Sequence, residues 1–378
     1  MKKSIYLDYL STTPMDERVQ KAMVDSFDDF GNPSSNTHGY GSKALELIHE
    51  ARAKTAQLIQ AKTREIIFTS GATESNNLAL KGVAYFYQRQ GKHLITMTTE
   101  HKAVLDPCRY LESQGFDVTY LAPCPSGCLD LSKLEEAIRP DTILISVMHV
   151  NNETGVIQDI QKIAEITQRN HVLFHVDAAQ SAARLPLNMS ECPIDLMSFS
   201  AHKMYGPKGI GALFIRHQQK RVQLVPQIHG GGQERGLRSG TLSTHQIVGF
   251  GKACDILINE LDQERARMQE LHHIFWEKIK KPSIHINGDP IFIAPGCFNL
   301  TIDNIDAEVL LKSLNNLAFS TGSACSAFNI TPSHVLLALG LSPERIQSTV
   351  RISFGRYTFQ EDVQYAAREF NDRIDKLQ

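Results

Sequence analysis

The sequence predicts an α/β fold, in which a large doubly wound domain is followed by a smaller α+β domain. Short apolar runs alternate with helix-like stretches between residues 64 and 215, a pattern typical of parallel strands joined by crossover helices. A long amphipathic stretch and a second, shorter group of strand-like and helix-like segments follow. The chain has 378 residues, of which 42% are hydrophobic, so it can bury more than one core.

Six apolar runs are the expected strands of the large domain. They are short and rich in Val, Ile, Leu and Phe, which favours strands over helices. Helices fill most of the gaps between them. The six runs cover residues 65–69, 93–97, 142–150, 172–176, 196–200 and 211–215.

The C-terminal part begins with a helical pattern from Ile247 to Trp276, which we expect to be one long connecting helix. Thr331 followed by Pro332 predicts a later helix start, because Thr is a good N-cap and Pro suits the first helical position. The other expected elements are strands near 297–302 and 350–354, a loop around 320–329 and a final amphipathic helix to Leu377.

Charge and cysteine usage exclude several classes of protein. The formal net charge of −2 provides neither a basic surface for nucleic acid nor the acidic excess of a disordered chain. No signal-peptide core and no apolar stretch of bilayer length is present, so we expect a soluble, cytoplasmic protein without a membrane partner. Seven scattered cysteines indicate reduced thiols. Cys124 and Cys128 match no strong metal spacing, so we expect a turn there and no metal site.

The carboxyl ends of the expected strands carry polar residues, and open parallel sheets bind ligands at this edge. After the first run, Ser70–Asn77 form a glycine-containing turn that opens a helix, whose free N–H groups could bind a phosphate. An ordinary helix capped by Thr73 or Ser75 is the alternative.

Three further strand ends supply reactive groups. His101 follows the second run, Asp177 the fourth and Lys203 the fifth. A structural histidine and a lysine with a solvated charge are the plainer interpretations. Asp177 follows a buried run and needs a cationic or N–H partner to offset its desolvation. Together the ends offer a phosphate cradle, an imidazole, an acid for a ring nitrogen and an amine for an aldehyde, which is the set that pyridoxal phosphate requires.

Nine short motifs, including those already described, follow one another along nearly the whole chain. They are Tyr6–Tyr9, Gly31–His38, Ser70–Asn77, Glu100–Lys102, Val150–Glu153, His175–Gln180, His202–Gly209, Gly230–Thr241 and Gly322–Cys325. In these motifs the sequence closely resembles the cysteine desulfurases of the IscS and NifS kind, which are class V, fold-type-I pyridoxal-phosphate enzymes. The lysine motif and the segment Arg238–Thr241 mark the broader class, and Gly322–Cys325 singles out the desulfurases.

The resemblance implies a fold-type-I pyridoxal-phosphate-dependent transferase, with a doubly wound mixed sheet in its large domain and L-cysteine as its substrate. Residues 15–255 would form the large cofactor-binding domain, and residues 1–14 and 256–378 the small domain with the cysteine loop. Lys203 would form an imine with the cofactor, and His101 would stack on its ring and move protons. The other implied roles are a ring-nitrogen contact of Asp177, a ring-hydroxyl contact of Gln180, phosphate binding by Thr73, Ser200 and His202, and cofactor contacts of Ala72 and Asn152.

Two groups of implied roles concern the substrate and a second subunit. Asn152 and Arg351 would bind the substrate carboxylate with help from Asn32, since an arginine suits bidentate pairing with a carboxylate. Arg356 is a further candidate for that task, with structural pairing as its alternative. Thr241 would reach the cofactor phosphate of the neighbouring subunit, which implies a homodimer.

Cys325 is the implied acceptor of sulfur. Its thiolate would attack the sulfur of bound L-cysteine and become a persulfide, while L-alanine leaves. A free thiol is only slightly ionised at neutral pH, so a base is needed, and His101 is the candidate. A small buried cysteine is the alternative, but the small polar neighbours of Cys325 favour a loop.

The sulfur would pass to an acceptor protein for iron–sulfur cluster assembly or tRNA thiolation, and the sequence does not choose between these. A selenocysteine lyase or a class V aminotransferase on the same fold is the nearest alternative, although an aminotransferase has no need for Cys325. A sulfur carrier that has kept the fold without turnover is another.

Overall fold

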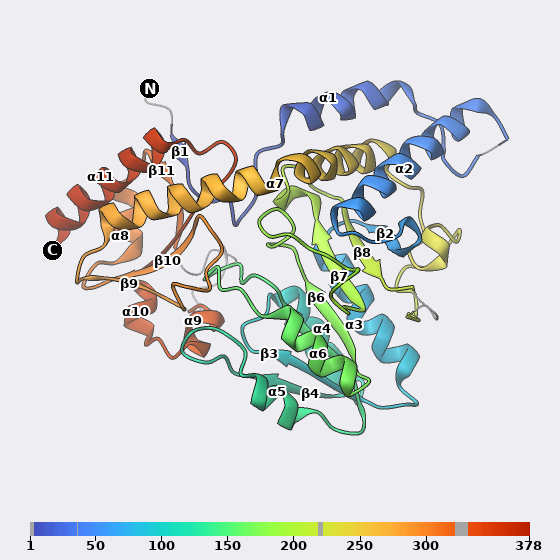
Figure 1. Cartoon of the computed structure of the whole chain (residues 1–378), viewed down its shortest axis with the longest axis horizontal. Coiled ribbons are helices and arrows are strands. Elements are labelled where there is room, and N and C mark those ends of the chain that lie inside the picture. The colour runs from blue at the N-terminus through green and yellow to red at the C-terminus, as the bar shows by residue number, and fades with distance from the viewer. Residues whose placement is uncertain (1–3, 36, 218–221, 322–331) are drawn as a thin grey trace.

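The computed structural model describes residues 4–35, 37–217, 222–321 and 332–378 of the chain. Figure 1 shows a large sheet with helices packed around it and, on the other side of the molecule, a smaller sheet beside the C-terminal helix. The predicted acceptor Cys325 and its motif Gly322–Cys325 lie outside the described residues.

Seven strands form the large sheet, in the order β2-β8-β7-β6-β5-β3-β4. The six predicted strands are confirmed, and the sheet has one edge strand, β4, that the sequence pattern did not reveal. All neighbours pair in parallel except β8, which is antiparallel to β2 and β7. The strands are β2 (Ile66–Thr69), β3 (His93–Met97), β4 (Asp117–Leu121), β5 (Thr142–Met148), β6 (Leu173–Asp177), β7 (Leu196–Ser200) and β8 (Gly211–Ile215).

The direction of β8 corrects the expectation that the apolar runs are parallel throughout. Residues 201–210 connect β7 to β8 and contain only the short 3₁₀ helix η3 (Ala201–Lys203). A parallel crossover needs about a dozen residues or more. The chain therefore returns antiparallel beside β7, and the sheet is mixed, as the predicted fold class has it.

Both faces of the large sheet are buried, which explains the nearly continuous apolar runs. Successive side chains of a strand point to opposite faces: Phe68 packs with residues of α2, α6 and α7, whereas Ile67 packs with residues of α3 and α4. The helices around this sheet are α1 (Glu17–Asp25), α2 (Gly39–Leu58), α3 (Ala72–Tyr87), α4 (Lys102–Ser113), α5 (Leu131–Ala137), α6 (Ile160–Arg169) and α7 (Thr244–Ile279).

The smaller sheet has four strands in the order β12-β13-β10-β9, and its neighbours pair antiparallel. The predicted strands near 297–302 and 350–354 and the final helix are confirmed as β10, β13 and α11. The elements of this part are β1 (Ile5–Tyr6), β9 (Ile284–Ile286), β10 (Cys297–Ile302), α8 (Ala307–Ser313), β11 (Leu317–Ala318), β12 (Ser320–Thr321), α9 (His334–Ala338), α10 (Pro343–Gln347), β13 (Thr349–Ser353) and α11 (Gln360–Leu377).

The predicted start of α9 is wrong by two residues. The N-cap is Ser333, not Thr331, because the Ser333 hydroxyl accepts a hydrogen bond from the backbone N–H of Leu336. Pro332 consequently lies before the helix.

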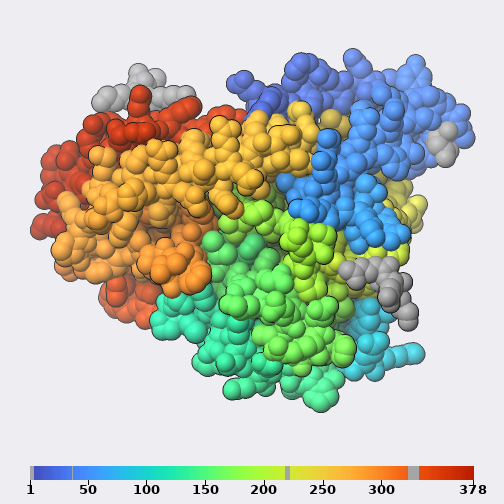
Figure 2. All heavy atoms as spheres, in the orientation of Figure 1, coloured from blue at the N-terminus to red at the C-terminus, as the bar shows by residue number. Residues whose placement is uncertain are grey.

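Helix α7 connects the two hydrophobic cores, as the long helical pattern predicts. Its residues Ile247 and Leu257 belong to the core of the large sheet, and Met268 and Phe275 belong to the core of the smaller sheet. In the space-filling view, α7 forms a band across the surface between the N-terminal helices and the C-terminal segments (Figure 2). The domain boundaries at 14/15 and 255/256 stay a prediction, which this change of core along α7 supports. Among the described helices, none is both long and apolar enough to cross a bilayer.

Candidate active site

A cavity of about 610 Å³ lies at the carboxyl ends of the large sheet. It receives residues from the start of α3, the ends of β6 and β7, the segment after β5, the strand β13 and the N-terminal residues 10–12. The structure therefore brings together groups that are far apart in sequence. The predicted site residues that line the cavity are Ala72, Thr73, His101, Asn152, Asp177, Gln180, Ser200, His202, Lys203 and Arg351.

The start of α3 has the form of an anion site rather than of an ordinary capped helix. Its N-cap is Gly71, and no side-chain cap bond exists among the described residues, so Thr73 and Ser75 do not cap the helix. Gly71 has φ 152° and ψ −178°, a conformation open to glycine but hardly to other residues. The Ser200 hydroxyl lies 3.6 Å from where a Cβ would stand at Gly71, so Ser200 and the first helical turn face the same space.

Asp177 ends β6 and is almost fully buried, and its carboxylate has the N–H partners that its burial requires. Asn76 Nδ2 donates to Oδ2 at 2.7 Å, and the backbone N–H of Ala179 donates to Oδ1 at 2.9 Å. Asn76 was not predicted to take part; its place one helical turn after Thr73 was the available signal. Its own Oδ1 is buried and has no hydrogen-bond partner within the described part of the chain.

Lys203 follows β7, next to β6 in the sheet, so its amine and the Asp177 carboxylate enter the cavity from neighbouring strand ends. The side chain is half-buried and is not the solvated surface charge of the alternative interpretation. Its Nζ donates to the backbone carbonyls of Leu10 at 2.5 Å and Ser11 at 2.7 Å. Gln180 Nε2 donates to the same Leu10 carbonyl at 2.8 Å.

The two cavity histidines are held in the neutral form by burial. Burial lowers the pKa of His101, and the positive charge of Lys203 adds to this effect against the opposite effect of Asp177. Its Nδ1 accepts the backbone N–H of Ala103 at 3.0 Å and caps α4, which leaves the ring proton on Nε2. Burial and the charges of Lys203 and Lys208 lower the pKa of His202 to about 4.

Arg351 enters the cavity from β13 and is only 2% exposed. Its Nη2 donates to Asp8 Oδ1 at 2.7 Å and to Ser320 Oγ at 3.2 Å, and its Nη1 donates to the carbonyl of Asn152 at 3.0 Å. Its Nε is buried without a hydrogen-bond partner among the residues that the structure describes. The Arg351 guanidinium thus pairs with one carboxylate, that of Asp8, and its Nε can still donate to a further acceptor.

The family model described as "Aminotransferase class-V" matches residues 5–366. The chain belongs to this family. Curated relatives extend the match over the whole chain: a cysteine desulfurase IscS of Shewanella woodyi is 51% identical over 381 residues, and one of Klebsiella pneumoniae is 50% identical. Both alignments cover 100% of this chain and 94% of the relative.

Solved structures of related proteins have the same fold. A NifS-like protein superposes with a TM-score of 0.92 at 35% identity and covers 99% of this chain and 100% of its own. SspA in complex with cysteine superposes with a TM-score of 0.84 at 43% identity and covers 94% of this chain and 100% of its own. The fold of the class V, fold-type-I enzymes is thereby confirmed.

Pyridoxal phosphate is the cofactor of this family, and the cavity fits it. The uncapped start of α3 suits a phosphate, the buried Asp177 suits a protonated ring nitrogen, and the Lys203 amine suits an aldehyde.

Two of the predicted site residues that the structure describes are absent from the cavity lining. Asn32 and Thr241 are exposed and are absent from the described lining, and the Asn32 side chain accepts the backbone N–H of Ser34 at 2.9 Å. Cys325 lies outside the described residues. Arg356 also lies away from the cavity lining, where ion pairs with Asp16 and Glu264 favour the structural alternative for it.

Proposed function

We propose that the protein is a pyridoxal-phosphate-dependent cysteine desulfurase, which converts L-cysteine to L-alanine and leaves the sulfur on Cys325 as a persulfide. The relatives named cysteine desulfurase support the reaction. The observation that carries the proposal is the placement of Lys203, Asp177 and Arg351 in one cavity. These groups provide an amine for the cofactor aldehyde, an acid for its ring nitrogen and a cation for the substrate carboxylate.

The residues that would hold the cofactor come from four strand ends. Lys203 holds the aldehyde carbon, Asp177 the ring nitrogen and Gln180 the ring hydroxyl. When bound, the cofactor withdraws electrons from the Cα of the amino acid and so makes its proton acidic. The other contacts in this proposal are those of Ala72, Thr73, Asn152, Ser200 and His202.

Arg351 and Asn152 bind the carboxylate of L-cysteine in this proposal. Among the described residues, the Nε of Arg351 has no hydrogen-bond partner. The guanidinium forms an ion pair with one carboxylate, that of Asp8. The substrate carboxylate can therefore bind to Arg351 without repulsion from a second protein carboxylate.

Proton transfer falls to His101, which is neutral at neutral pH because of its lowered pKa. To accept a proton, its Nδ1 must give up the cap bond from Ala103. Sulfur transfer falls to Cys325: its thiolate attacks the substrate sulfur, the sulfur–Cβ bond breaks, and the electron pair left on carbon is protonated, which gives alanine.

The active unit in this proposal is a cytoplasmic homodimer that passes its sulfur to an acceptor protein, such as an iron–sulfur scaffold or a tRNA-thiolation protein. The exposure of Asn32 and Thr241 supports a role of both residues in the partner subunit's cavity. Large exposed aromatic side chains flank Asn32 in sequence, namely Phe27, Phe30 and Tyr40, as a subunit contact would require.

Incubation of the purified protein with L-cysteine and a reductant tests the reaction. Repeated turnover with equal amounts of alanine and sulfide per cofactor is expected. A bound cofactor without alanine contradicts the proposal, and amino-group transfer or selenocysteine cleavage would then be tested. Cys325→Ala should keep the cofactor absorbance but accumulate no persulfide. Cys124→Ala, which removes a half-buried thiol of the described part of the chain, should behave as the wild type.

A further inference from the structure

The N-terminal segment of residues 10–16 lies along residues 202–205, which form the turn that carries Lys203 and are called the lysine turn below. The carbonyls of Leu10 and Ser11 accept from Lys203 Nζ. Further along, the N–H and the hydroxyl of Thr13 both donate to the carbonyl of His202 at 3.0 Å. Asp16 completes the contact, since its N–H donates to the carbonyl of Tyr205 at 3.0 Å. The lysine turn is thus fastened to a segment about 190 residues away in sequence.

Tyr205 is the strained point of this turn. It lies two residues after Lys203 and has φ +60°, a left-handed conformation that is costly for a bulky residue. Such a conformation persists only where the surroundings impose it. Here the backbone N–H of Tyr205 donates to Thr13 Oγ1 at 2.8 Å, and its phenol oxygen accepts the backbone N–H of Arg356 at 2.7 Å.

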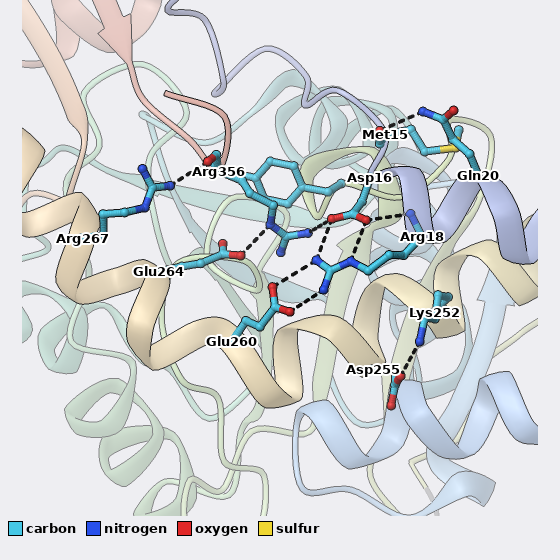
Figure 3. Close-up of polar contacts among 11 residues, drawn as sticks. Met15, Asp16, Arg18, Gln20, Lys252, Asp255, Glu260, Glu264, Arg267 and Arg356 are labelled. Carbon is cyan, nitrogen blue, oxygen red and sulfur yellow. Dashed lines mark hydrogen bonds and ion pairs between the residues drawn. The ribbon is translucent and has the colours of Figure 1, made fainter. Parts of the chain in front are cut away.

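Arg356 holds this arrangement from outside the cavity. Its guanidinium carbon lies 4.2 Å from the centre of the Tyr205 ring. Its Nη1 donates to Asp16 Oδ2 at 2.6 Å and its Nε donates to Glu264 Oε1 at 2.5 Å (Figure 3). One buried side chain therefore joins the end of the N-terminal segment, helix α7 and the lysine turn.

The charges around Arg356 exclude a substrate carboxylate there. Two guanidinium groups, those of Arg356 and Arg18, face three carboxylates, those of Asp16, Glu260 and Glu264 (Figure 3). Arg356 Nη2 is buried without a hydrogen-bond partner among the described residues, but a further anion there would be repelled by the excess of negative charge. The cluster can position other residues but cannot bind the substrate.

We propose that Arg356 is a positioning residue for Lys203, because it fixes Tyr205 and through it the direction in which the lysine amine points. The inference rests on the proposed role of Lys203 as the amine that binds the cofactor. A positioning residue of this kind acts on the formation of the lysine–cofactor bond itself, before any substrate is present.

Apoenzyme mixed with pyridoxal phosphate, followed by the visible imine absorbance, tests this inference. Arg356→Ala should slow imine formation about tenfold or more, since small misplacements of a reacting group are costly. Arg356→Lys keeps a positive charge but not the planar guanidinium that donates to two carboxylates. It should recover part of the rate of imine formation. Arg18→Ala is the matched control: it breaks ion pairs of the same cluster, with Asp16 and Glu260, but leaves Tyr205 untouched. It should stay within about twofold of the wild type.

Thermal unfolding of each variant separates positioning from general loss of structure. Slow imine formation in Arg356→Ala at temperatures far below its unfolding midpoint supports the inference. Equal slowing in Arg18→Ala, or a wild-type rate in Arg356→Ala, overturns it. A higher KM for L-cysteine in Arg356→Ala with an unchanged imine rate overturns it as well and makes Arg356 a substrate ligand. Imine formation in Lys203→Ala would instead contradict the proposed function.

Discussion

Arg351 and Arg356 lie five residues apart, in the middle of β13 and in the turn after it, yet their surroundings differ. Arg351 faces the cavity, pairs with one carboxylate, Asp8, and keeps a buried Nε without a described partner. Arg356 lies away from the cavity lining, pairs with Asp16 and Glu264 and stacks on Tyr205, and its Nη2 is likewise buried without a described partner. The two arginines therefore differ in the carboxylates beside them, one for Arg351 and two for Arg356, and only Arg351 can take a substrate carboxylate without a second protein carboxylate next to it.

The largest effect is expected at the lysine that lies between these two regions. Lys203→Ala should abolish the imine absorbance and lower desulfuration about 10³-fold or more, because the cofactor loses its covalent attachment. Lys208→Ala removes the other lysine that borders the cavity and should keep the imine absorbance. An unchanged chromophore that borohydride still reduces in Lys203→Ala would show that another amine is used.

Asp177→Asn is expected to have the next largest effect. The amide can still accept the hydrogen bond from Asn76 but carries no charge to keep the ring nitrogen protonated. Turnover should fall about 100-fold while the cofactor stays bound. In Asn76→Ala, which removes one hydrogen bond to the same carboxylate, turnover should fall less. Equal losses in steady-state turnover would contradict the assigned role of the charge.

Arg351→Lys tests the cavity side of the comparison. Loss of the planar, two-armed guanidinium should raise the KM for L-cysteine about 10- to 100-fold, with a smaller change in kcat. Arg356→Lys should leave this KM close to that of the wild type. If both variants raise KM equally, the distinction between the two arginines fails.

The smallest effect concerns a histidine of the core. Burial lowers the pKa of His175 to about 3, from about 6.5 in the unfolded chain. Below pH 6.5 the unfolded state therefore binds a proton that the native state refuses, and the free energy of unfolding falls by about 1.4 kcal/mol per pH unit from this group. His175→Gln should flatten that slope in urea unfolding between about pH 5 and 7. An unchanged slope would contradict the assignment.

The fold was predictable from sequence where both faces of a strand are buried, since β5 and β6 then appear as nearly continuous apolar runs. The edge strand β4 escaped because it mixes polar and apolar residues, with only Val118 buried. Asp177, His101 and Lys203 could be singled out because each ends such a run or follows one within a few residues. Arg351 and Cys325 were implied only by the resemblance to the family.

Other parts of the site could not be predicted from sequence. The lysine contacts of Leu10 and Ser11 are made by backbone carbonyls, which any residue type carries. The pairing of Arg356 with Asp16 joins residues 340 positions apart, so no local pattern announces it. Sequence motifs therefore identify which side chains react, whereas contacts between residues far apart in sequence determine how those side chains are oriented.

Mass spectrometry of the protein after brief exposure to L-cysteine is the most direct test of sulfur transfer to Cys325. One added sulfur atom is expected on the peptide that contains Cys325, and none in Lys203→Ala treated in the same way. Added sulfur on Cys325 in both proteins, or on neither, would contradict a persulfide that forms through the Lys203 cavity.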